Sequence, residues 1–170
     1  MPFWWPSLIF VKTMKLTIQT GQDNPILREK STPVKTHELH LYRTLGETMV
    51  TYIKNPKHKG IGLAAPQVGV NKRIIVVWLP NKRDDDSYSI ILMINPEITQ
   101  KSAQTDTDEE WCLSLPWLLG NVLRSTSIEL EWIDIRGRKM KKTITGYGAR
   151  VVQHEIDHLD GVMICDKFLK

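Results

Sequence analysis

The chain has 170 residues, of which 41% are hydrophobic and 25% charged, with a net charge of +4. This composition predicts a soluble globular domain with its own core, and the length is too short for two ordinary domains. No Lys and Arg run is dense enough to indicate DNA binding, and no apolar run reaches the ~20 residues of a membrane-spanning helix. The two cysteines, Cys112 and Cys165, form no disulfide framework and favour a reducing compartment.

The N-terminal thirteen residues, "MPFWWPSLIFVKT", are apolar and aromatic. They lack the basic start and the small-residue cleavage site that mark a signal peptide. The sequence that follows Met14 has the character of a natural beginning. We therefore expect 1–13 to be an N-terminal extension or a misassigned start, and 14–170 to form a single domain.

The first half of the chain predicts one helix and several strands. Apolar residues recur at helical spacing over 37–53, which indicates an amphipathic helix. The Gly- and Pro-containing stretch 60–70, "GIGLAAPQVGV", favours a shaped loop or an irregular strand. β-Branched runs at 73–79 and 90–95 predict two strands joined by a polar loop. The polar and acidic stretch 101–110, "KSAQTDTDEE", is expected to be a loop.

The second half predicts a hairpin followed by a helix. Residues 128–135 alternate between apolar and polar, turn at Arg136–Gly137 and return through 139–145. After Gly146 the apolar period becomes helical, and Gly161 supplies a stop. The predicted fold class is α+β, with mixed or antiparallel short strands packed around a C-terminal helix and an amphipathic helix near the N-terminus.

The predicted C-terminal helix carries the motif "HEIDH" at 154–158. His154 and His158 would lie one turn apart on one face, with Glu155 beside them. Two imidazoles at this spacing can hold one metal ion while the carboxylate lies next to a water molecule. Two histidines on a core-facing helix can also be purely structural. A catalytic metal site needs a third ligand.

The position of the third ligand separates two interpretations. The metalloprotease pattern HExxHxxGxxH needs a histidine where this chain has Ile164, and the chain ends at Lys170, so we expect the ligand upstream. Candidates are scattered carboxylates and four named side chains: His37, His40, His58 and Cys112. Cys112 lies in an apolar stretch and would complete a three-ligand site with an open position. A lone cysteine is, however, most often a small buried hydrophobic residue.

Three motifs in order resemble those of the peptide deformylase family. "GIGLAAPQ" (60–67), "EWCLS" (110–114) and "HEIDH" (154–158) stand where that family has GxGxAAPQ, EGCxS and HExxH. The resemblance runs from about Lys15 to Lys167. It implies that 14–170 is a catalytic domain, a metal-dependent hydrolase that removes the formyl group from the N-terminal formyl-methionine of nascent polypeptides. It also implies a bacterial cytoplasmic location, with an organellar one as the alternative.

The resemblance assigns roles to particular residues. The ligands of one divalent ion, natively Fe²⁺ and replaceable by Ni²⁺, Co²⁺ or Zn²⁺, would be Cys112, His154 and His158. Glu155 would act as general base and then general acid. The side-chain amide of Gln67 and the backbone N–H of Leu113 would donate to the developing oxyanion.

The same resemblance implies how a formyl-methionyl peptide binds. Gly60 and Gly62 would let the loop backbone approach a peptide that adds as a strand. Ile61, Val151 and the apolar residues after Pro116 would surround the methionine side chain. We expect a monomer, and ribosome docking is not expected because only nine residues follow Gly161.

The chain departs from the family pattern at Trp111, which replaces the glycine next to Cys112. If this position needs a glycine backbone angle, the tryptophan strains the loop by about 1–3 kcal/mol. If it is extended, the indole points away from Cys112. Trp117 could join it in one apolar patch. Three interpretations of the substitution are open. It can be neutral drift, it can reshape the rim of the site while metal binding stays intact, or it can mark an impaired relative that only binds N-terminal peptides.

Overall fold

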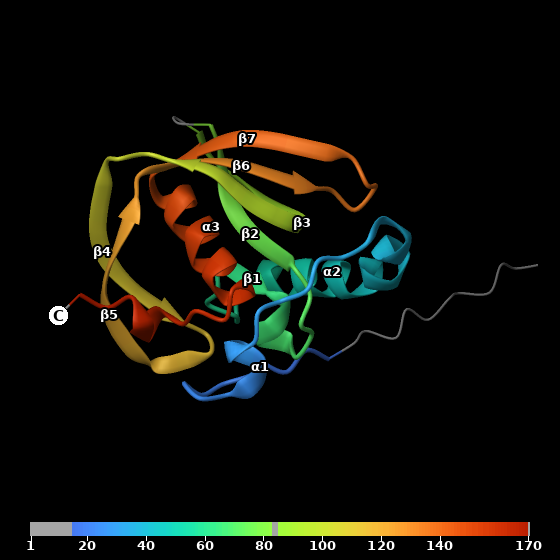
Figure 1. Cartoon of the computed structure of the whole chain (residues 1–170), viewed down its shortest axis with the longest axis horizontal. Coiled ribbons are helices and arrows are strands. Elements are labelled where there is room, and N and C mark those ends of the chain that lie inside the picture. The colour runs from blue at the N-terminus through green and yellow to red at the C-terminus, as the bar shows by residue number, and fades with distance from the viewer. Residues whose placement is uncertain (1–14, 83–84, 170) are drawn as a thin grey trace, which may run out of the picture.

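The computed structural model describes residues 15–82 and 85–169, so the expected extension over 1–13 lies outside the described residues (Figure 1). Two antiparallel sheets hold the strands. The five-stranded sheet has the order β1 (Gly62–Ala64), β2 (Ile74–Lys82), β3 (Asp85–Lys101), β6 (Ser127–Ile133), β7 (Lys139–Thr145). The second sheet pairs β4 (Thr105–Cys112) with β5 (Leu115–Ser125). The α-helices are α1 (Pro25–Arg28), α2 (Leu39–Lys54) and α3 (Gly146–Leu159), and short 3₁₀ helices occupy Thr36–Glu38, Ala65–Val68 and Ile164–Asp166.

The five-stranded sheet is buried on both faces along the first half of β2, whereas β7 is mostly exposed. Side chains alternate along a strand, so Ile75 and Val77 join the core beneath α3 while Ile74 and Val76 join the core beneath α2. A strand covered on both faces must be apolar throughout, which explains the continuous run "IIVV". The predicted α+β arrangement, with the C-terminal helix packed on antiparallel strands, is confirmed.

The stretch 101–110 was expected to be a loop, and that prediction is wrong. Most of it forms β4, whose residues pair with β5 from Thr105 opposite Ser125 to Glu110 opposite Gly120. Only Glu110 and Cys112 of β4 are buried, so the strand carries almost no apolar signal. Its stability comes from pairing with β5, the next strand along the chain, which the apolar periodicity of β4 itself does not reveal.

The other predicted elements are present but differ in length, and α1 and β5 were not predicted. The amphipathic helix over 37–53 is confirmed as α2, and the hairpin as β6 paired with β7. The strands predicted at 73–79 and 90–95 continue into polar residues, with Lys82 opposite Asp85. Within the described ranges, no helix combines the length and the apolar character needed to cross a membrane.

The end of α3 depends on Gly161. Its φ of +73° lies in the left-handed region, and a Cβ there would meet the carbonyl oxygen of Arg28 at 2.3 Å. The chain therefore turns away from the helix against the backbone of α1. A glycine at this position satisfies both the angle and the close approach.

We predict that Gly161→Ala lowers the free energy of unfolding by about 3 kcal/mol, because backbone strain is added to the clash with Arg28. Gly146→Ala is the matched control, since Gly146 also has a positive φ, +59°, but open space where the Cβ would lie. We expect about 1 kcal/mol for the control. Urea unfolding of both variants measures the difference, and equal losses would show that the contact with Arg28 is unimportant.

Candidate metal centre and active site

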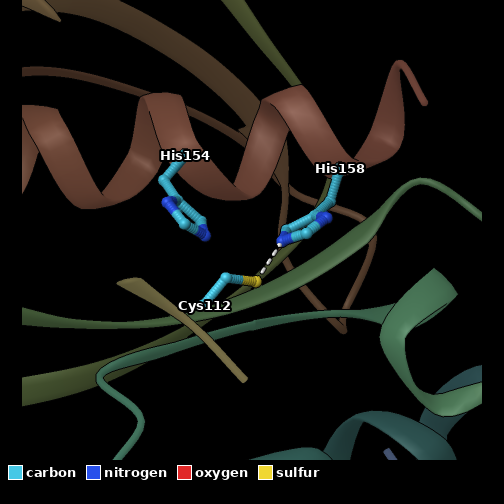
Figure 2. A group of neighbouring side chains, drawn as sticks. All are labelled: Cys112, His154 and His158. Atoms are coloured by element: carbon cyan, nitrogen blue, oxygen red, sulfur yellow. Dashed lines mark hydrogen bonds between the residues drawn. The ribbon is translucent and has the colours of Figure 1, made fainter. Parts of the chain in front are cut away.

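Three ligand-bearing side chains meet where β4 ends against α3. Cys112 is the last residue of β4, and His154 and His158 project from consecutive turns of α3 toward it (Figure 2). Cys112 Sγ lies 3.1 Å from His158 Nε2, and one ligand atom from each of the three residues lies within 4.8 Å of the others. Bond lengths of about 2.3 Å to sulfur and 2.0–2.1 Å to nitrogen fit one ion between atoms this close. The three predicted ligands therefore form a group that could hold a metal.

The surroundings of Cys112 favour the thiolate form of its side chain. Burial would raise its pKa, but the neighbouring His158 and His154 hold that pKa well below the usual thiol value. The backbone N–H of Ser114 also donates to Cys112 Sγ at 3.4 Å. Because the thiolate is the form that binds metals, these contacts favour the ligand state before any ion arrives.

His154 is oriented by a buried carboxylate. Its Nδ1 lies 2.9 Å from Glu110 Oε2, so Nδ1–H donates to Glu110 and Nε2 faces the ligand group. Burial would raise the pKa of Glu110, but hydrogen bonds from Arg124 and His154 hold it well below its usual range. The carboxylate is therefore ionised, and it selects the tautomer whose Nε2 is free for a metal.

Two arginines hold Glu110 in turn. Arg124, on β5, donates from Nε and Nη2 to the two carboxylate oxygens at 2.6 and 2.8 Å, and Arg150, on α3, donates from Nη1 to Oε1 at 2.8 Å. Both guanidinium groups are buried. Arg124 also pairs with Asp157 at 2.7 Å, and Arg150 with Asp106 at 2.6 Å. The network ties the β4–β5 pair to the helix that carries both histidines.

Sequence reasoning missed this network, although the sequence contains a signal for it. Arg150, His154 and His158 are four residues apart in succession, so Arg150 lies on the ligand face of the helix. An arginine between Ala149 and Val151, on a buried helix face, requires a buried anion. Glu110 stands within the quoted motif, two residues before Cys112, and could have been assigned as that anion.

Glu155 is the free carboxylate of the site. It is 4% exposed, and its Oε2 has no hydrogen-bond partner among the described residues. Burial raises its pKa to about 7. A group with this pKa can both accept and release a proton near neutral pH.

Gln67 presents an oriented amide to the same centre. Its Oε1 accepts the backbone N–H of Ala64 at 2.9 Å, which turns Nε2 toward Cys112 Sγ at 3.5 Å and Ser114 Oγ at 3.2 Å. The side chain is buried, so this orientation is fixed. Gln67 therefore places an N–H donor next to the ligand group.

A cleft opens over the centre, between β1, the end of β4 and α3. The predicted residues that line it are Gly60, Ile61, Gly62, Gln67, Cys112, Leu113, Val151, His154 and Glu155. Four residues not predicted to contribute, Glu109, Glu110, Tyr147 and Arg150, line it as well. The residues that follow Pro116 do not belong to the cleft lining, and Trp117 is 67% exposed. The expectation that they would surround a methionine side chain is therefore not supported.

Trp111 is a paired residue of β4, and the register of the β4–β5 ladder shifts directly after it, between Trp111 and Cys112. It pairs with Leu119 in the β4–β5 ladder. Among the described non-glycine residues only Asn95 has a positive φ, so the backbone at Trp111 does not need a glycine. Its side chain is 44% exposed while Cys112 is buried, as alternation along a strand requires. The indole thus lines the rim without straining the ligand position.

A thiolate and two imidazoles beside a free carboxylate are the arrangement of a mononuclear metal site of the kind that metallohydrolases use. The comparisons identify the family. Residues 16–170 match the sequence model of polypeptide deformylases, and the chain belongs to this family.

Relatives and solved structures agree with this assignment. A peptide deformylase from Prochlorococcus marinus (strain NATL2A) is 52% identical over 109 residues, covering 64% of this chain and 53% of that protein. One from Pelotomaculum thermopropionicum is 41% identical over 141 residues, covering 82% of each. A structure from Acinetobacter baumannii with Met-Ala-Ser bound has a TM-score of 0.81 at 33% identity, covering 92% of this chain and 99% of that one. The chain spans about half the length of the first of these relatives.

We predict that Glu110→Gln weakens metal binding about 10–100-fold, because the amide no longer fixes the His154 tautomer as an ionised carboxylate does. Competition for Co²⁺ or Ni²⁺ against a chromophoric chelator measures the affinity, and circular dichroism shows whether the variant is folded.

Glu109→Gln is the matched control for this prediction. It removes the same charge from the adjacent residue of β4, whose side chain is exposed and points to the other face. Equal metal affinity of the Glu110→Gln variant and this control would contradict the role given to Glu110.

Proposed function

We propose that this chain hydrolyses the N-formyl group of peptides that begin with formyl-methionine, releasing formate and a free amino terminus. The observation that carries the proposal is the grouping of three possible ligands at one centre, with two of them, one free carboxylate and one oriented amide donor lining a single cleft. The peptide found in the Acinetobacter baumannii relative supports a peptide as the occupant of that cleft. The substrate is then a linear amide at the end of a chain.

The residues divide the chemistry among themselves. Cys112, His154 and His158 would hold a divalent ion, which when bound would supply Lewis-acid activation of water and of the formyl carbonyl. Glu155 takes a proton from the attacking water and delivers it to the leaving amine as the C–N bond breaks. Gln67 Nε2 and the backbone N–H of Leu113 donate to the oxygen on which negative charge develops, a contribution of typically ~10²–10³ in rate per donor.

The peptide is proposed to bind as an added strand between two sheet edges. Among the described strands, β1 pairs with β2 alone and β4 pairs with β5 alone, so each has an unpaired edge. Both elements line the cleft, which lets an extended peptide hydrogen-bond to their backbones. Ile61, Leu113 and Val151 supply apolar surface for the methionine side chain.

Fe²⁺ is the proposed native ion, with Ni²⁺, Co²⁺ and Zn²⁺ as substitutes. One thiolate and two imidazoles accept all four ions, so availability and preparation decide which is bound. The alternative of an impaired peptide-binding relative has no support, because Trp111, its only basis, leaves the ligand group, Gln67 and Glu155 in place.

We predict that Glu155→Gln lowers the rate of formate release from a formyl-Met tripeptide by about 10²–10⁴-fold while the protein still binds its metal, because the amide cannot carry the proton. A formate dehydrogenase-coupled assay with Ni²⁺-loaded protein gives the rate, and elemental analysis gives the metal content. Glu47→Gln, an exposed glutamate of α2, is the control. Retained turnover in the Glu155 variant would refute the proposed proton transfer.

We also predict that Gly62→Ala lowers kcat/KM at least tenfold. A Cβ at Gly62 would lie 2.2 Å from Glu155 Oε1 and must displace that carboxylate. Such small displacements of a catalytic group cost about 10²-fold in unfavourable cases. Gly60→Ala is the comparison variant, because its Cβ would meet the flexible tip of Leu113 at 2.8 Å. An equal or larger loss in the Gly60 variant would contradict the importance of the close approach to Glu155.

A further inference from the structure

The two faces of β4 present different chemistry to the cleft. Glu110 and Cys112 point toward α3, where Glu110 contacts His154 and Cys112 contacts His158. Glu109 and Trp111 alternate with them and therefore lie on the opposite face, where both are exposed. Both also line the cleft. The outer rim of the cleft thus places a carboxylate and an indole two residues apart on one face of a strand.

The carboxylate on this rim is not neutralised by the protein. No ion pair of the described residues includes Glu109, whose partner across the ladder is Asn121. The guanidinium that lines the cleft, that of Arg150, is buried and already bound to Glu110 and Asp106. A negative charge therefore remains beside the exposed indole.

The direction of the peptide determines which of its residues meets this rim, and this step rests on the proposed function. Side chains of an extended peptide alternate between the two faces of the sheet it joins. With the methionine side chain on the α3 side, against Val151, the side chain of the second residue points to the opposite face. That face carries Trp111 and Glu109.

We propose that Glu109 and Trp111 form a subsite for a basic side chain at the second position of the formylated peptide. The aliphatic stem of lysine or arginine covers the indole, and the cationic head lies near the Glu109 carboxylate. A neutral apolar side chain gains only the first of these contacts. An acidic side chain is repelled by Glu109. The enzyme thereby favours nascent chains that begin with formyl-methionine followed by lysine or arginine.

The test compares three formyl-Met-X-Ser peptides in which X is lysine, norleucine or glutamate. Lysine and norleucine share the alkyl stem, so their ratio of kcat/KM isolates the charge. We expect a lysine to norleucine ratio of about five and a larger lysine to glutamate ratio, in line with single exposed charge contacts. The ratio should fall toward one at high salt, because exposed charges are screened.

Variants separate the two halves of the subsite. Glu109→Gln should bring the lysine to norleucine ratio close to one, whereas Glu47→Gln, which removes a distant exposed charge, should leave it unchanged. Trp111→Gly should lower kcat/KM for both long side chains relative to formyl-Met-Ala-Ser by about threefold. Equal use of the three peptides, or a ratio unaffected by Glu109→Gln, would overturn the inference while leaving the deformylase activity intact.

Measuring the affinity for the deformylated products tests the subsite separately from the proposed deformylase activity. If none of the peptides releases formate, the proposed function is wrong, and calorimetry with Met-Lys-Ser and Met-norleucine-Ser then decides about the subsite. Tighter binding of the lysine peptide, lost in Glu109→Gln, supports it. Equal affinities overturn it.

Discussion

The buried carboxylate of Glu110 is the interaction on which the rest of the site depends. It receives hydrogen bonds from Arg124, Arg150 and His154, which come from the second strand of the small sheet and from α3. A buried charge is tolerated only when it is paired and its hydrogen bonds are satisfied. This requirement fixes β4 against α3 and thereby brings Cys112 to both histidines.

The larger sheet provides the rigid base for this arrangement. α3 lies between the five-stranded sheet and the β4–β5 pair, and its buried side chains pack on β2 and its neighbours (Figure 1). One face of the helix is therefore committed to the apolar core, while Arg150, His154 and His158 are turned to the small sheet. The short β1 strand brings Gly62 against Glu155, so the carboxylate is held from the sheet side as well.

Those parts of the molecule with a local signature could be predicted from sequence, and those that depend on distant partners could not. The amphipathic helix α2, the β6–β7 hairpin and the histidine spacing on α3 each have a clear period or spacing. The grouping of Cys112 with the two histidines followed from motif chemistry and family resemblance. β4 was mistaken for a loop because its acidic residues are stabilised by β5 and by arginines far along the chain. Arg124 was missed because pairing of buried charges has no fixed spacing, whereas the helical spacing of Arg150 from the two histidines was a signal that could have been used.

The three possible metal ligands also connect the two-stranded sheet to α3. Cys112 belongs to β4 of that sheet, and His154 and His158 belong to α3, which packs on the five-stranded sheet. An ion bound there would act as a cross-link, and by thermodynamic linkage its binding energy would add to the stability of the docked hairpin. Local opening of β4–β5 would then favour release of the ion. Amide hydrogen exchange in this hairpin would therefore slow when an ion is bound.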